Sequence, residues 1–163
     1  MSFFRRGDKR PTSFEYARIL VPVIGDDAVD EPALKVAGLL LAGREEGEVA
    51  LLHVIEVTFD RNLDSEDDEA VASADQILTR AEALLEERGV KVRTSTVQAR
   101  VAGPAIVDEA NEQEADLILM GLRYKKRFGG QWDAGRTVPY VMRNSTAPVW
   151  CLRAETKELA HTP

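Results

Sequence analysis

The segment between residues 121 and 137, GLRYKKRFGGQWDAGRT, combines the residue types that hold a phosphate group. It contains four glycines, and its five cations stand against the single acid Asp133. Glycine lets backbone N–H groups turn toward an anion, while arginine and lysine supply charge. Gly121 closes an apolar run, where it could bring N–H groups toward a ligand. A segment of this kind between a strand and a helix is typical of phosphate-binding loops, although a solvated surface loop has the same composition.

The end of this segment is expected to begin a helix. Thr137 is the predicted N-cap, because its hydroxyl can accept a hydrogen bond from a first-turn N–H. Pro139 then falls in the first turn, where its missing N–H is harmless. The N–H groups of such a helix terminus attract anions. Phe128 and Trp132 could stack on a base, pack on a partner or fold back onto the core, and the sequence leaves these alternatives open.

Alternating strand and helix patterns surround the segment and would position it. Apolar, β-branched runs predict strands at residues 17–24, 48–57, 91–99, 116–120 and 147–153. Helical spacing of apolar residues predicts helices at 30–44, 64–88 and 103–114, and after Thr137. This order implies a three-layer α/β/α sandwich, in which helices cover both faces of a five-stranded parallel sheet. In such sheets the ligand crevice lies at the carboxyl ends of the strands.

Length and composition restrict the alternatives. The 163 residues allow one domain, expected at 17–153, with a basic arm at 1–16 and a polar tail at 154–163. The net charge of −7 disfavours a nucleic-acid-binding surface, and no apolar run is long enough to span a membrane. With Cys151 as the only cysteine and two histidines, neither an internal disulfide nor a zinc-type metal site is expected. We therefore expect a cytoplasmic protein with no catalytic set.

Two aspartates and one histidine near the expected crevice have ordinary structural interpretations. Asp26 and Asp27 could contact Mg²⁺ but are more simply the residues that precede a helix. His53 lies within a strand and is expected to be a satisfied histidine of the core or the sheet end.

Four pieces of the chain resemble the universal stress protein family in their order and spacing. They are RILVPVIGD, LLHVIEV, VAGPAIVDEANEQEADLILMG and GRTVPYVMRNSTAPVWCLR, and the resemblance covers about residues 17–153. It implies the strand order 3-2-1-4-5 and a homodimer, which would pair through the edge strand at 147–153. Many members of the family bind ATP through G-x-x-G-x9-G-[ST], with an aspartate that ends the first strand.

The chain departs from this ATP motif at several positions. Gly121 matches the first glycine, but Tyr124 stands at the second and Ile24 at the aspartate. Arg136 replaces the serine or threonine, and Thr137 follows it. A side chain at 124 obstructs a close backbone approach, and Ile24 cannot accept hydrogen bonds. The extra cations could instead hold phosphates by charge.

The expected function is therefore the binding of an adenine nucleotide, ATP or AMP, in a non-standard way. The residues expected to border it, from the crevice and the resemblance together, are Pro22, Val23, Ile24, Val54, Met120, Gly121, Arg123, Lys125, Arg127, Gly135, Arg136 and Thr137. The alternative is a nucleotide-free dimeric module that regulates a protein partner such as a transporter, since the cationic segment is also similar to stress-protein domains attached to amino-acid permeases. Slow ATP hydrolysis is the least favoured function.

Overall fold

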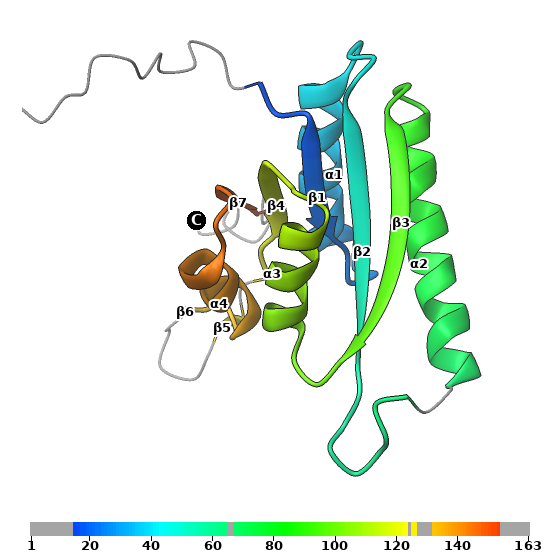
Figure 1. The fold of residues 1–163 in the computed structure, drawn as a ribbon, viewed down its shortest axis with the longest axis vertical. Coiled ribbons are helices and arrows are strands. Elements are labelled where there is room, and N and C mark those ends of the chain that lie inside the picture. The colour runs from blue at the N-terminus through cyan, green and yellow to red at the C-terminus, as the bar shows by residue number, and fades with distance from the viewer. Residues whose placement is uncertain (1–14, 65–66, 124, 127–131, 154–163) are drawn as a thin grey trace, which may run out of the picture.

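A computed structural model of the chain describes residues 15–64, 67–123, 125–126 and 132–153 (Figure 1). The predicted polar tail and the predicted basic arm up to residue 14 lie outside the described residues. So do Tyr124, Arg127 and Phe128.

The described chain alternates strands and helices along most of its length. The main sheet consists of β1 (Arg18–Pro22), β2 (Glu48–Glu56), β3 (Lys91–Ala99), β4 (Leu117–Gly121) and β7 (Val149–Leu152). The helices are α1 (Asp27–Leu41), α2 (Asp68–Glu86), α3 (Ala102–Glu112) and α4 (Thr137–Asn144). Two short strands, β5 (Lys125–Lys126) and β6 (Trp132–Asp133), lie between β4 and α4.

The main sheet is parallel throughout, with the order β3-β2-β1-β4-β7. This confirms the predicted five-stranded sheet of order 3-2-1-4-5. β1 lies between β2 and β4, so the strand order reverses on either side of it. The carboxyl ends of β1 and β4 therefore face the point where an α/β sheet of this kind opens a crevice.

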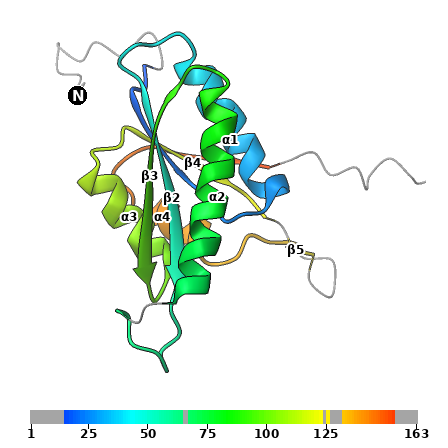
Figure 2. The same ribbon diagram turned by 90° about the vertical axis from the view of Figure 1, so that its right-hand side faces the viewer.

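The helices cover both faces of the sheet, as predicted. α1 and α2 lie on one face and α3 and α4 on the other, and the two views show the sheet between them (Figures 1 and 2). Successive residues of β1 alternate between the two cores, because strand side chains point to opposite faces. Ile19 and Val21 pack with α1 and α2, whereas Leu20 packs with α3 and α4. All three are fully buried.

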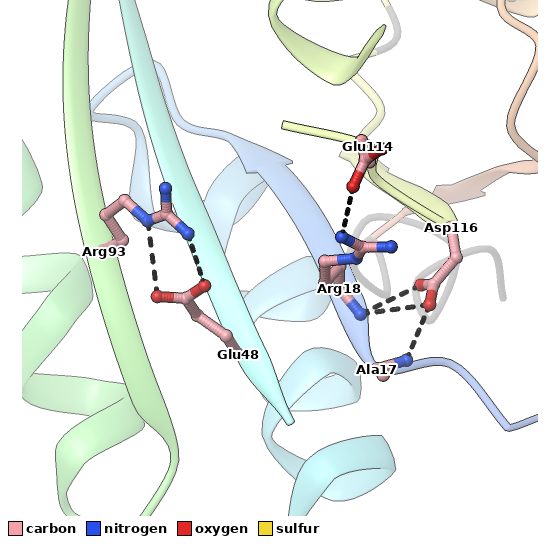
Figure 3. Close-up of polar contacts among 6 residues, drawn as sticks. All are labelled: Ala17, Arg18, Glu48, Arg93, Glu114 and Asp116. Atoms are coloured by element: carbon pink, nitrogen blue, oxygen red, sulfur yellow. Dashed lines mark hydrogen bonds and ion pairs between the residues drawn. The ribbon is translucent and has the colours of Figure 1, made fainter. Parts of the chain in front are cut away.

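Polar contacts fasten the amino-terminal edge of the sheet (Figure 3). The Asp116 carboxylate, just before β4, accepts hydrogen bonds from the backbone N–H groups of Ala17 at 2.8 Å and Arg18 at 3.1 Å. The Arg18 guanidinium reaches back to Glu114 at 2.7 Å. On the next strand pair, Arg93 of β3 donates to Glu48 of β2 at 2.6 Å, and this hydrogen bond lowers the pKa of Glu48. These contacts lie at the amino-terminal ends of the strands. The candidate site is expected at the opposite, carboxyl ends.

The first helix begins earlier than predicted. The expected start was residue 30, but α1 begins at Asp27 and has Pro32 within it. The reason is the turn before it, where Gly25 takes a φ of +84° and the Asp26 side chain accepts a hydrogen bond from the Ala28 N–H at 3.1 Å. Asp26 is thus the N-cap of α1, in agreement with its interpretation as a residue that precedes a helix.

Two short paired strands lie within the loop expected between residues 121 and 137. β5 and β6 are antiparallel, with Lys125 opposite Asp133 and Lys126 opposite Trp132. They form a separate two-stranded sheet and do not extend the main one. In Figure 2, β5 lies to the right of the body formed by the main sheet and its helices. Part of the cationic segment is therefore ordered by its own backbone pairing.

Candidate functional site

A cavity of about 370 Å³ opens at the carboxyl ends of β1, β2 and β4. Its lining includes these predicted site residues: Pro22, Val23, Ile24, Val54, Met120, Gly121, Arg123 and Thr137. Of the other predicted residues, Lys125 lies in β5, Arg127 lies outside the described residues, and Gly135 and Arg136 precede α4 without lining the cavity. The structure thus gathers the predicted strand-end residues around one cavity, and the two ends of the 121–137 segment, at Gly121, Arg123 and Thr137, contribute to its described lining.

The walls also include residues that sequence reasoning did not assign to a site. They are Val29, Asp30, Leu52, His53, Glu56, Ala102, Ile106, Ala134 and Val138. Val23, Leu52, Ile106, Met120 and Val138 are buried and give the cavity an apolar floor. Ile24 lies at the mouth and is 51% exposed. An apolar floor of this size suits a flat, poorly hydrated ring system.

Asp30 is the buried carboxylate of the site. It is 7% exposed, and it accepts hydrogen bonds from the backbone N–H groups of Ile24 at 3.1 Å and Gly25 at 2.7 Å. Burial raises the pKa of Asp30, and the backbone hydrogen bonds act in the opposite direction. The carboxylate therefore holds the turn between β1 and α1 in place. Asp30 lies on the same face of the helix as the buried residues Leu34 and Leu41. This helical spacing is the sequence signal that could have predicted the burial of Asp30.

Gly121 lines the cavity and also packs closely against α1. Its predicted role of bringing N–H groups toward a ligand stays a prediction. A Cβ built on Gly121 would overlap the backbone carbonyl oxygen of Val29 and lie 2.7 Å from the carbonyl carbon. Its φ is also not among the positive values of the chain. Glycine is required here because helix and strand backbones touch.

Arg123 is the cation of the described lining, and it is already paired. Its guanidinium forms an ion pair with the Asp26 carboxylate. The same carboxylate caps α1 through its other oxygen, so the backbone of the helix holds one end of the pair. Arg123 therefore links the segment after β4 to the N-cap of α1.

His53 faces the cavity from β2 and is satisfied, as expected. Its Nδ1 lies 2.9 Å from the Val23 carbonyl oxygen, which can only accept a hydrogen bond. Nδ1 therefore carries the proton in the neutral ring, and Nε2 is left as an acceptor. Glu56, further along β2, accepts a hydrogen bond from the Ala102 N–H at 2.8 Å and so caps the start of α3.

The amino-terminus of α4 borders the cavity without a side-chain cap. Thr137 was predicted as the N-cap, but it is the first residue of the helix, and Arg136 is the N-cap residue with no side-chain hydrogen bond. The backbone of Arg136 has αR angles, so it already adopts a helical conformation although it is the N-cap residue. The N–H groups of Thr137 and Val138 have no acceptor within the helix, and Pro139 has no N–H. Both Thr137 and Val138 line the cavity.

The described residues include neither a metal-binding cluster nor a membrane-spanning helix. Within the described ranges, histidine, cysteine, aspartate and glutamate side chains do not gather in the threes that a metal site would need. In the same part of the chain, no helix has the length and apolar character needed to cross a membrane.

Comparison with known proteins agrees with the geometry. A model of the universal stress protein family matches residues 15–153. The universal stress protein of Archaeoglobus fulgidus is 24% identical with a TM-score of 0.69, and the match covers 83% of this chain and 98% of that one. A search of curated protein sequences found no match.

Similar structures that contain a nucleotide include the following two. The Archaeoglobus fulgidus protein in complex with dAMP is 23% identical, with a TM-score of 0.66 and coverage of 84% and 98% of the two chains. An Arabidopsis thaliana family protein with AMP bound is 12% identical, with a TM-score of 0.65 and coverage of 87% and 94%. At these identities the likeness establishes the fold.

Proposed function

The chain belongs to the universal stress protein family, and from that membership we propose that it binds an adenine nucleotide without turning it over. The observation that carries the proposal is the cavity of about 370 Å³ at the strand ends, with an apolar floor and a polar rim. Cavities of about 300–1,000 Å³ hold small ligands in most proteins. The nucleotide complexes of the similar structures, with dAMP and with AMP, support the same class of ligand.

Binding in this cavity is non-standard for the family. Ile24 supplies apolar surface at the mouth, where the family motif has an aspartate, so the ligand meets no carboxylate there. The Asp30 carboxylate accepts hydrogen bonds from the backbone N–H groups of Ile24 and Gly25, so it stabilises the turn. Contact with the apolar floor then contributes most of the affinity, since each Å² of apolar surface removed from water is worth about 25 cal/mol.

A role without catalysis fits the arrangement of the polar groups. Among the described lining residues, Asp30, Glu56 and Arg123 are each held by a protein partner, and Nδ1 of His53 is held by a carbonyl. None of them is paired with a nucleophile in the way that hydrolytic enzymes require. We propose a regulatory protein of the cytoplasm, in which occupancy of the cavity is the signal.

Filling the mouth of the cavity tests the nucleotide proposal. Ile24→Trp places a large ring at a half-exposed position of the mouth, so it should abolish binding while the fold survives. The matched control is Leu39→Trp, at a position of α1 that is 73% exposed and does not line the cavity. AMP is titrated by calorimetry into the wild type and both variants. We expect binding to the wild type and to Leu39→Trp, and a loss of at least about tenfold in Ile24→Trp.

Absence of AMP and ATP binding by the wild type would contradict the proposal. The nucleotide-free interaction module, acting on a protein partner such as a transporter, would then be favoured. Mass spectrometry of small molecules released when the purified protein is denatured gives an independent result, because a tightly bound nucleotide would be recovered with the protein.

We also propose a homodimer through the β7 edge of the sheet. β7 is the last strand on its side of the described sheet, and the edge strand of a sheet is a template for pairing with a second chain. Beside it on α4, Met142 is 58% exposed, and its sulfur lies 3.8 Å from that of Cys151 in β7. The edge and this apolar side chain form one surface.

Met142→Glu should convert the dimer into a monomer, because it places a charge on the proposed apolar interface. Light scattering at micromolar protein measures the mass. Leu39→Glu, on the opposite face of the sheet, is the control and should remain dimeric. A monomeric wild type, or a dimer that persists in Met142→Glu, would contradict this interface.

A further inference from the structure

We propose that the cavity selects a nucleotide with a single phosphate over a nucleoside triphosphate, and that Asp26 sets this preference by occupying Arg123. The inference rests on the proposed function, since it specifies the ligand of the same cavity.

The described lining is poor in positive charge. Asp30 and Glu56 contribute carboxylates, and Arg123 is the cation among the described residues that line the cavity. With His53 neutral, these groups sum to a formal charge of −1 before Asp26 is considered. A nucleoside monophosphate brings a charge of about −2 at pH 7, and every further phosphate adds negative charge. The described groups of the lining therefore disfavour each added phosphate.

The ion pair with Asp26 lowers the capacity of Arg123 for phosphate. Asp26 Oδ1 accepts from the Ala28 N–H at 3.1 Å, while Oδ2 faces the Arg123 guanidinium. The carboxylate is thus fixed by the backbone of α1 and cannot follow the ligand. A polyphosphate that recruited Arg123 would have to break the pair or lie against the Asp26 charge. Either event weakens triphosphate binding selectively, because a single phosphate needs fewer cations.

The start of α4 also offers a limited number of donors. Thr137 and Val138 have N–H groups without an intrahelical acceptor, and Pro139 removes the N–H that would come next. The two N–H groups and the Thr137 hydroxyl match the acceptors of one phosphate. The small number of donors therefore favours a single phosphate, as does the charge of the described lining.

Freeing Arg123 tests the role of Asp26. Asp26→Asn removes the charge that holds Arg123 but keeps a residue that caps helices well, so the fold should persist. Asp27→Asn, at the adjacent exposed position, is the matched control for the change in net charge. AMP and ATP are titrated by calorimetry into all three proteins at the same ionic strength, each with and without Mg²⁺, because phosphate contacts are sensitive to salt.

We expect the wild type and Asp27→Asn to bind AMP at least about tenfold more tightly than ATP. In Asp26→Asn the ratio should fall toward one, mainly through tighter ATP binding. Equal affinities in the wild type, or an unchanged ratio in Asp26→Asn, would overturn the inference while leaving nucleotide binding intact. Failure of both nucleotides to bind the wild type would overturn the proposed function and this inference with it.

Discussion

Gly121→Ala is expected to lower the free energy of unfolding by about 3 kcal/mol, at the upper end of the usual cost of overpacking. The added methyl group would overlap the backbone carbonyl of Val29, and backbone cannot move aside as the end of a side chain can. Either α1 must separate from β4 or the strand must bend. For a chain of this length, about 3 kcal/mol corresponds to a decrease in melting temperature of roughly 6–12 °C.

Gly38→Ala provides the control for this prediction. Its Cβ would lie 2.7 Å from Cδ of Arg88, which belongs to a long and flexible side chain. Alanine is also favoured over glycine within a helix by about 1 kcal/mol. Gly38→Ala should therefore be neutral or stabilising in the same thermal unfolding experiment. A Gly121→Ala protein that melts with the wild type would mean that α1 and β4 are not in backbone contact.

The sheet could be predicted from the sequence because its strands carry an unambiguous signal. Residues 116–120 are apolar without alternation, which is typical of a strand buried on both faces, and Leu117, Ile118 and Leu119 are indeed fully buried. The long helix predicted at 64–88 appears as Asp68–Glu86, with the Asp67 side chain as its N-cap. Strand pairing then follows from the few ways in which such units can connect.

The site was predicted less completely, because its decisive contacts join residues far apart in the sequence. The position of Gly121 at a strand end suggested a ligand, but the partner that requires glycine is Val29, in another element. The pairing of Arg123 with Asp26 spans 97 positions and follows no local pattern. The hairpin of β5 and β6 was missed because its strands contain two residues each, too few for periodicity to be visible.

Removing the Asp30 carboxylate should be the second large effect. Asp30→Ala leaves the N–H groups of Ile24 and Gly25 without their acceptor in a partly buried turn. Each unsatisfied buried donor costs about 1–3 kcal/mol, so we expect a loss of roughly 2–4 kcal/mol in urea unfolding. Asp27→Ala, on the exposed side of the same first turn, should cost less than about 1 kcal/mol. Equal losses in the two variants would contradict a specific role for Asp30.

The pH dependence of the stability of Asp30→Asn shows whether burial or backbone hydrogen bonding dominates the pKa of Asp30. Burial raises the pKa of Asp30 above 3.8, so the folded state holds the proton more tightly than the unfolded chain. The stability contributed by Asp30 is then lost as the pH rises from the unfolded pKa through the folded one. Asn does not titrate, so the stability of Asp30→Asn relative to the wild type should improve between pH 4 and pH 7. If the variant instead becomes relatively less stable as the pH rises, the backbone hydrogen bonds of Ile24 and Gly25 outweigh burial. Asp30 would then be an anion that the turn stabilises, and ionisation would strengthen the cavity wall.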